Sequence, residues 1–128
     1  MHIPQDYGTL LLRVALGTMF IAHGLLKVLV FTLPGTVQFF ASQGYPSALA
    51  YAVIPAEIAG GALLILGVYT RWVALTLVPV LLGAASVHAP NGWLFSAPGG
   101  GWEYPAFLAA ATAVQSLLGG GAFAFKDK

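Results

Sequence analysis

Residues 7–31, YGTLLLRVALGTMFIAHGLLKVLVF, decide the fold of this chain, because they form one long apolar run interrupted by basic side chains. A helix needs about 20 mostly apolar residues to cross the hydrocarbon core of a bilayer, and this run is long enough. The interruptions are Arg13, His23 and Lys27. A charged side chain at mid-bilayer costs roughly 2.5–3.5 kcal/mol on insertion scales. These side chains must therefore face other protein groups or reach the membrane surface.

The composition of the whole chain points to the same lipid solvent. Only 7% of its residues are charged and 59% are hydrophobic, and the mean hydropathy is +0.86, whereas an average protein has about 25% charged residues. A formal net charge of +1 argues against nucleic acid as a partner. The chain has no cysteine, which excludes disulfides, CxxC redox chemistry, thiolate-held iron–sulfur clusters and covalently attached c-type haem.

Four stretches are apolar enough to predict membrane-spanning helices: 7–31, 48–67, 72–87 and 104–123. We therefore predict an all-α fold, an integral membrane four-helix bundle of two helical hairpins, as a single domain over residues 1–128. The linker 33–46 is punctuated by proline and glycine, and is expected to hold a short helix at the membrane interface. The first span is too long for the apolar region of a signal peptide, so we expect it to be retained.

Basic residues in the short loops indicate the orientation in the membrane. Arg71 lies in the turn between the second and third predicted spans, and Lys126 and Lys128 lie in the C-terminal tail. The two long linkers contain neither lysine nor arginine. By the positive-inside rule, we expect both termini and the short turn in the cytoplasm.

The polar residues of the first span share one face of a helical wheel. At about 100° per residue, Arg13, His23 and Lys27 fall on the same side as the small residues Gly17 and Gly24. The opposite side is rich in leucine, valine and isoleucine. We therefore expect the polar face to pack against another helix and the apolar face to meet lipid.

Glu57 is the acidic residue near the middle of a predicted span, so it is the expected counter-charge for this polar face. We predict that His23, Lys27 and Glu57 form a buried polar cluster able to bind a ligand, and we assign no catalytic residue. Two simpler interpretations stay open. In the first, Glu57 pairs with Lys27 only for stability. In the second, a backbone carbonyl satisfies the hydrogen bonding of His23.

Four further polar residues are secondary candidates for this site: Arg13, Arg71, His88 and Asn91. Each also has a structural interpretation. Arg71 fits a positive-inside anchor, His88 a C-terminal helix cap and Asn91 a turn, and Arg13 is placed to reach the cytoplasmic surface. A haem shared by His23 and His88 is disfavoured because the two residues fall at different depths. No stretch has metal-ligand spacing, so we predict no metal site.

Two pairs of similar stretches suggest an internal duplication. RVAL at Arg13 resembles RWVAL at Arg71, and PAEIAGGALLILG at Pro55 resembles PAFLAAATAVQSLLG at Pro105. Duplication of a helical hairpin would produce a parallel repeat. The alternative is chance similarity among membrane helices that are rich in small residues.

Four stretches together resemble the DoxX family of small bacterial membrane proteins: RVALGTMFIAHGLLKV (13–28), FFASQGYP (39–46), PAEIAGGALLILGVYTRWVAL (55–75) and SVHAPNGW (86–93). The resemblance implies a four-helix, multi-pass bundle in the bacterial cytoplasmic (inner) membrane with an oxidoreductase role. It also implies a link to thiosulfate:quinone oxidoreduction and to membrane complexes that handle oxidative stress, with which relatives in this family are associated. The polar residues that match the family pattern are His23, Lys27, Glu57, Arg71 and His88.

Three functions fit these residues. The first is a quinone-interacting subunit of a membrane redox system, in which His23 with Lys27 or Glu57 meets the quinone carbonyl oxygens. The chain encodes no flavin, nicotinamide or haem motif, so a soluble or membrane redox partner would supply the electrons, and whether the chain itself is an enzyme stays open. The alternatives are a non-catalytic membrane module that recruits or stabilises a partner enzyme, and a small transporter, which would need a homo-oligomer. In every case the chain is expected to contact the lipid bilayer.

Overall fold

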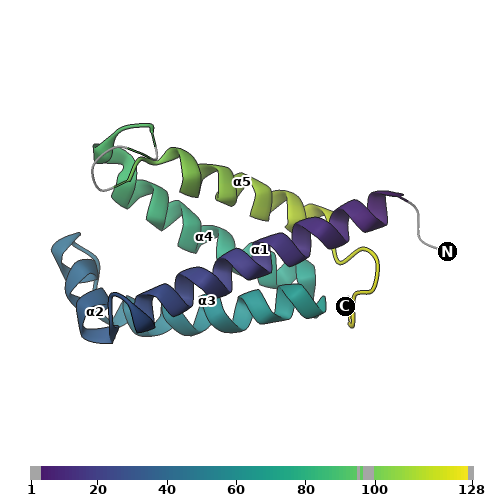
Figure 1. Cartoon of the computed structure of the whole chain (residues 1–128), viewed down its shortest axis with the longest axis horizontal. Coiled ribbons are helices and arrows are strands. Elements are labelled where there is room, and N and C mark those ends of the chain that lie inside the picture. The colour runs from purple at the N-terminus through teal and green to yellow at the C-terminus, as the bar shows by residue number, and fades with distance from the viewer. Residues whose placement is uncertain (1–3, 95, 97–99, 127–128) are drawn as a thin grey trace.

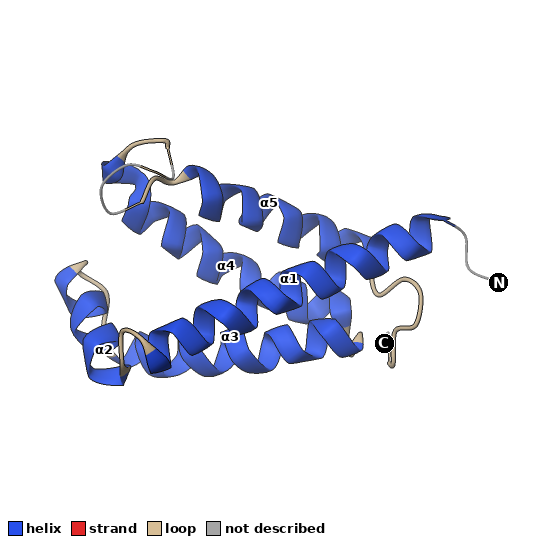
Figure 2. Ribbon diagram, viewed as in Figure 1, coloured by secondary structure: helices blue, strands red, loops and turns tan. Residues whose placement is uncertain are grey.

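Helices are the main secondary structure of the described part of the chain. The computed structural model describes residues 4–94, 96 and 100–126, and the extended pairing within them is a single bridge between Val68 and Lys126. Figure 2 shows the helices and the loops that connect them. The predicted all-α class is confirmed. In chain order the elements are α1 (Pro4–Leu29), α2 (Leu33–Ser42), α3 (Ala48–Leu66), α4 (Thr70–His88), the short 3₁₀ helix η1 (Ala89–Asn91) and α5 (Glu103–Leu118).

The short helix predicted in the linker 33–46 is present as α2. Thr32 precedes it, and its side-chain oxygen accepts a hydrogen bond from the Gly35 N–H at 3.2 Å. Pro34 lies in the first turn, where its missing N–H leaves no helix bond unmade. The Thr36 hydroxyl then donates to the carbonyl of Lys27 at 3.0 Å. The start of α2 is therefore tied directly to the last turn of α1.

Helices α1 and α3 form a closely packed pair (Figure 1). A β-carbon added to Gly17 would lie 2.5 Å from the Gly61 carbonyl oxygen, and one added to Gly61 would lie 2.6 Å from the Gly17 carbonyl oxygen. The two backbones meet at these glycines, and no larger residue fits there. Small residues at a helix interface allow this approach, which is the usual basis of packing between membrane helices.

Helices α4 and α5 form the second pair. The main apolar core lies where this pair meets the first one, and its buried members are Leu16, Phe20, Leu64, Ala74, Leu77, Leu81, Leu108 and Ala109. Figure 1 shows the two pairs close together at the end that carries both chain termini and divergent toward α2. The molecule therefore has one tightly packed end and one open end.

The segment after α5 crosses the tightly packed end, and we call residues 119–126 the C-terminal strap. The Ala122 N–H donates to the Asp6 carbonyl at 3.0 Å, next to the start of α1. The Lys126 N–H donates to the Gly67 carbonyl at 3.0 Å, and the Tyr69 N–H donates to the Lys126 carbonyl at 2.6 Å. The strap thus joins the start of α1 to the turn between α3 and α4.

The fourth predicted span differs from the helix that forms. The sequence predicts 104–123, whereas α5 ends at Leu118, because Gly119 adopts a positive φ of 83° and the chain leaves the helix there. With a rise of 1.5 Å per residue, its 16 residues reach about 24 Å, which is shorter than the ~30 Å hydrocarbon core. Among the described residues, three helical stretches are long and apolar enough to cross a membrane: Pro4–Leu29, Ala48–Leu66 and Thr70–Asn91.

The Gly17–Gly61 contact predicts a selective loss of stability. Gly61→Ala places a methyl group against a backbone carbonyl, so we expect the free energy of unfolding to fall by about 1–3 kcal/mol. Gly83→Ala on α4 is the matched control, because a β-carbon at Gly83 would meet no atom within 4 Å and alanine favours a helix over glycine. The measurement is the melting temperature of the purified protein in detergent. Equal melting temperatures for the two variants would contradict the close approach.

Candidate functional site

The last turn of α1 and the middle of α3 carry opposite charges that meet. Lys27 Nζ donates to Glu57 Oε1 at 2.7 Å, which is both a hydrogen bond and an ion pair. The Glu57 side chain is 5% exposed and that of Lys27 is 22% exposed. The structure therefore brings together two of the three residues that the sequence assigns to a polar cluster, inside the α1–α3 pair.

Gly24 makes room for this ion pair. A β-carbon at Gly24 would lie 3.4 Å from Glu57 Cβ and 2.5 Å from Ile58 Cγ1, so α3 can approach α1 here only because residue 24 lacks a side chain. Within the described part of the chain, the second carboxylate oxygen of Glu57 has no hydrogen-bond partner. An ammonium group has three N–H donors, and Lys27 uses one of them on Glu57. The pair therefore keeps both an acceptor and donors for a further ligand.

His23 lies on the same face of α1 but makes a different set of contacts. Its Nδ1 is 2.7 Å from the carbonyl of Met19, one turn earlier in its own helix. Its ring centroid is 5.8 Å from that of Tyr104 on α5. A bond to a carbonyl requires the proton on Nδ1, which leaves Nε2 of a neutral imidazole as an acceptor. Among the described residues no hydrogen bond joins His23 to Lys27 or Glu57, so the three residues do not form one bonded cluster.

His88 and Asn91 meet at the carbonyl of Gly100. His88 Nδ1 lies 3.2 Å from this oxygen, and Asn91 Nδ2 donates to it at 2.8 Å. Both residues thus hold the loop before α5 against the end of α4. They also line a pocket of about 290 Å³ that opens between α2 and α4. The lining residues are Phe39, Gln43, Val87, His88, Pro90 and Asn91.

The described residues 4–94, 96 and 100–126 bring no three histidine, aspartate or glutamate side chains together in a geometry that would hold a metal ion. The chemistry offered by the site is instead that of hydrogen bonding and proton exchange. Its groups are one ion pair within the first helix pair, one imidazole facing α5, and an amide-lined pocket at the open end of the molecule.

Comparison with known proteins places this arrangement in a family, because the DoxX family model matches residues 8–89. The chain belongs to the DoxX family. This DoxX chain is also 44% identical, over 84 residues, to a protein of Bacillus subtilis (strain 168) named "Putative oxidoreductase CatD". That match covers 66% of this chain and 61% of the relative, which is less than two thirds of the relative's length. No solved structure matches the chain.

The DoxX match includes the polar residues on which the sequence interpretation rests. His23, Lys27 and Glu57 fall within residues 8–89, as do Arg71 and His88. Asn91 and the whole of α5 lie beyond the matched region. The Lys27–Glu57 pair therefore belongs to the part of the chain that carries the family resemblance, whereas the face that Tyr104 presents to His23 does not.

The sequence suggests that Arg13 reaches the membrane surface. In the structure of the DoxX chain it is instead fully buried, with 0% exposure. Its guanidinium donates to the carbonyls of Leu64 at 3.0 Å and Ile65 at 2.5 Å in the last turn of α3. It also donates to the carbonyls of Gly120 and Ala122 in the C-terminal strap, both at 2.9 Å. The last carbonyls of a helix lack partners within that helix, and Arg13 satisfies them from the neighbouring one.

Arg71 makes a related contact in the second helix pair. Its Nη1 donates to the carbonyl of Leu117 in the last turn of α5 at 3.0 Å. A β-carbon at Gly67 would meet Arg13, and one at Gly119 would meet Arg71. Each of these glycines directly follows a helix and has a positive φ. In each pair an arginine on the first helix thus holds the end of the second. These matching contacts support the internal duplication that the similar stretches suggest.

Three contributors to the site have no clear signal in the sequence. Tyr104 reads as the start of the fourth span, yet its hydroxyl donates to the Met19 sulfur at 3.6 Å and its ring faces His23. Gln43 lies in a linker and becomes a wall of the α2–α4 pocket. The Tyr45 hydroxyl and the Ser86 hydroxyl are 2.6 Å apart and join the loop between α2 and α3 to α4. All three depend on contacts between segments that are far apart in the chain.

The contacts of Arg13 predict a local effect of its removal. In Arg13→Met the Gly120 and Ala122 carbonyls lose their donor, so we expect the C-terminal strap to detach and its amides to exchange hydrogen much faster. Leaving buried carbonyls unpaired costs about 1–3 kcal/mol each, so the melting temperature should also fall. Hydrogen–deuterium exchange of residues 119–126 is the measurement.

Arg71→Met is the matched control, because Arg71 is exposed and contacts the end of α5 rather than the carbonyls of the strap. We expect it to leave exchange at residues 122–126 close to that of the wild type. Unchanged exchange of the strap in Arg13→Met would show that Arg13 does not hold it.

Proposed function

We propose that this DoxX protein is a membrane component of a redox system and that it interacts with quinone through Lys27, Glu57 and His23. The observation that carries the proposal is the ion pair of Lys27 and Glu57, held at 2.7 Å between two apolar helices with one carboxylate oxygen left without a partner in the described chain. Ionisable groups inside a membrane helix pair are expensive, and they commonly mark sites that handle protons or ligands. The family and the name of the Bacillus subtilis relative support a redox role.

The residues fit the chemistry of a quinone. Reduction of a quinone to its quinol consumes two electrons and two protons at the two carbonyl oxygens. The remaining N–H groups of Lys27 are hydrogen-bond donors for a carbonyl oxygen, and Glu57 in its protonated form is a proton donor. His23 keeps Nε2 as a second group that takes up or releases a proton. These side chains would meet a quinone at the edge of its ring, where the carbonyl oxygens lie, and move protons at their own atoms.

The electrons come from outside the chain in this proposal. The sequence has no cysteine, so a thiol or thiolate-held cluster cannot carry them. The donor is therefore a soluble or membrane redox partner with its own cofactor. The proposal makes the DoxX chain a quinone-binding subunit, and the electron-transfer centre belongs to the partner.

The contacts at the tightly packed end support the proposed orientation in the cytoplasmic membrane. The Lys126 carbonyl accepts from the Tyr69 N–H, two residues before Arg71, and the Ala122 N–H binds the Asp6 carbonyl. Figure 1 shows N and C at this same end. The basic turn, the basic tail and the start of α1 therefore share one side of the molecule. We propose that this side faces the bacterial cytoplasm, as the positive-inside rule requires.

A second function is a membrane module that recruits or stabilises a partner enzyme without binding quinone. It is favoured by the short Lys27–Glu57 distance and by the bond of His23 to its own helix, because satisfied polar groups of this kind also serve packing alone. In that case the ion pair is replaceable by apolar residues of similar volume.

The two functions predict different outcomes when the ion pair is replaced. Removing one partner of a buried pair destabilises a protein by about 3–5 kcal/mol, whereas replacing both is often neutral. The double variant Lys27→Met with Glu57→Leu should therefore stay folded. We expect it to lose the rise in melting temperature that duroquinone, a tetramethyl benzoquinone, causes in the wild type. Glu57→Gln should weaken duroquinone binding by about tenfold, because Lys27 loses the hydrogen bond to a charged carboxylate that holds it in place.

Glu103→Gln is the control, because Glu103 is an acid at the start of α5 and outside the ion pair. It should bind duroquinone as the wild type does. A double variant that folds and keeps the full duroquinone shift would refute the quinone role and support the recruiting module.

A further inference from the structure

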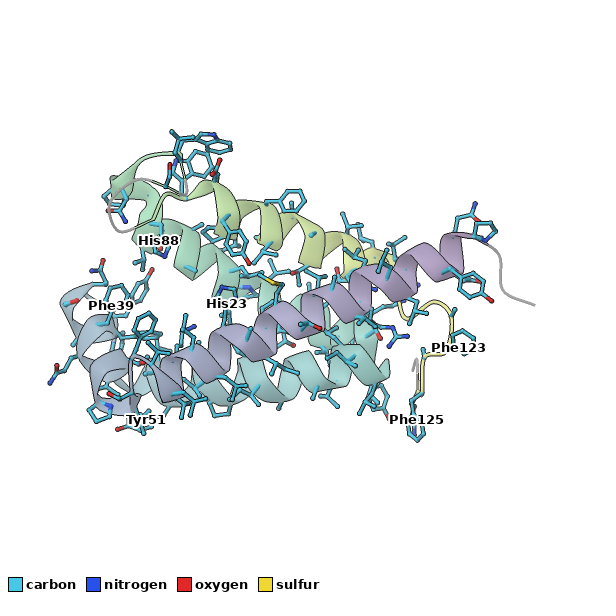
Figure 3. The ribbon with its side chains drawn as sticks, in the orientation of Figure 1. His23, Phe39, Tyr51, His88, Phe123 and Phe125 are labelled. Atoms are coloured by element: carbon cyan, nitrogen blue, oxygen red, sulfur yellow. The ribbon has the colours of Figure 1, made fainter. Side chains whose placement is uncertain are left out.

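The open end of the molecule holds a pocket between the two helix pairs. Its volume is about 290 Å³, and it lies between α2 on one side and the end of α4 with η1 on the other. Figure 3 shows Phe39 on α2 and His88 on α4 on opposite sides of this space, and His23 on α1 further toward the packed end. Ligand pockets usually measure roughly 300–1,000 Å³, so this one suits a small ring rather than a large cofactor.

The pocket is lined by both apolar side chains and amide groups. Phe39, Val87 and Pro90 supply the apolar surface. In the part of the chain that the structure describes, the side-chain amide of Gln43 has no hydrogen-bond partner. The Asn91 amide donates one of its two N–H groups to the Gly100 carbonyl and keeps the other. These amides therefore offer N–H donors in a pocket that the Phe39 ring also lines.

A hydrogen bond beside this pocket joins the loop between α2 and α3 to α4. The Tyr45 and Ser86 hydroxyls are 2.6 Å apart, and these residues lie close in sequence to the pocket residues Gln43 and Val87. Tyr45 is itself packed against Phe40, with ring centroids 6.5 Å apart. This contact holds the loop that follows Gln43 against α4, beside the pocket.

The space beside the ion pair is much smaller. A single β-carbon at Gly24 would already lie 2.5 Å from Ile58 Cγ1 and 3.4 Å from Glu57 Cβ, so a ring cannot enter between α1 and α3 at this point. The pocket is linked to the pair through α2. Thr36 binds the Lys27 carbonyl at 3.0 Å, and the same short helix carries Phe39 one turn later.

We propose that the pocket between α2 and α4 binds the ring of a quinone, with Phe39 against its face and the amides of Gln43 and Asn91 donating to its two carbonyl oxygens. The identity of the ligand rests on the proposed function, whereas the site is a different one from the ion pair. A planar ring with an oxygen acceptor at each of two opposite edges matches an apolar pocket with separate N–H donors. Lys27 and Glu57 do not line this pocket, so binding of the ring here and proton exchange at the ion pair are separable.

Tryptophan fluorescence offers a direct test, because quinones quench it on close approach. Trp93 and Trp102 lie beside the pocket, since the Trp102 N–H donates to the carbonyl of Gly92, the residue after Asn91. Trp72 lies near the start of α4, about 25 Å from that end at 1.5 Å per residue. The Trp72→Phe protein in lipid nanodiscs therefore reports on the pocket when it is titrated with duroquinone.

Gln43→Leu in this background removes the free amide and keeps the side-chain size. We expect the dissociation constant for duroquinone to rise about fivefold, as for one lost hydrogen bond, and Phe39→Ala to raise it further. Gln38→Leu is the matched control, since Gln38 lies on α2, which Gln43 directly follows, is exposed and does not line the pocket. Its dissociation constant should equal that of the wild type.

The outcomes separate this site from the ion pair. If Gln43→Leu and Phe39→Ala bind duroquinone as tightly as Gln38→Leu while Glu57→Gln binds weakly, the pocket proposal is overturned and the ion-pair function stands. If Gln43→Leu weakens binding and Glu57→Gln does not, the pocket stands and the role of the ion pair falls. If the wild type shows no saturable quenching, both proposals fall.

Discussion

The contact between the backbones of Gly17 and Gly61 is the constraint on which the rest of the structure depends. It brings α1 and α3 so close that the polar groups on their facing sides must be satisfied across the interface. Toward one end of the pair, Lys27 meets Glu57, and toward the other, Arg13 reaches the last carbonyls of α3. Without the glycine contact neither cation would find its partner inside an apolar helix pair, and each would face lipid at a high cost in free energy.

The two cations of α1, Arg13 and Lys27, are stabilised by different kinds of partner, and the two ends of the molecule differ accordingly. Four carbonyl oxygens accept hydrogen bonds from Arg13, and these come from α3 and from the C-terminal strap. That end is therefore locked by several directional bonds. At the other end the Lys27–Glu57 ion pair joins α1 to α3, and the Tyr45–Ser86 hydroxyl contact joins the loop between α2 and α3 to α4. A protein that binds a ligand between helices needs this combination of a rigid end and an end that can admit it.

The sequence predicts the parts of the site that depend on helical periodicity. A wheel places Lys27 on the inner face of α1, and the scarcity of acids makes Glu57 its partner, so their contact follows from two simple rules. His23 departs from the expected cluster because a histidine can bind the carbonyl one turn earlier in its own helix, which a wheel does not reveal. The predicted end of the fourth span is wrong because the apolar pattern of the sequence continues past Gly119, where the backbone adopts a positive φ and leaves the helix. Gln43 and Asn91 line the same α2–α4 pocket. No local sequence pattern predicts that two segments so far apart in the chain lie close together.

The bonds of Arg13 to the C-terminal strap also bear on how the protein is made. Arg13 and Gly120 are 107 residues apart, and synthesis proceeds at about 5–20 residues per second. The first helix therefore waits roughly 5–20 s at the translocon, at that rate of synthesis, before its guanidinium can meet the strap. During this interval the arginine depends on water, lipid phosphate or the insertion machinery, so the final assembly of the helices must follow the synthesis of the strap.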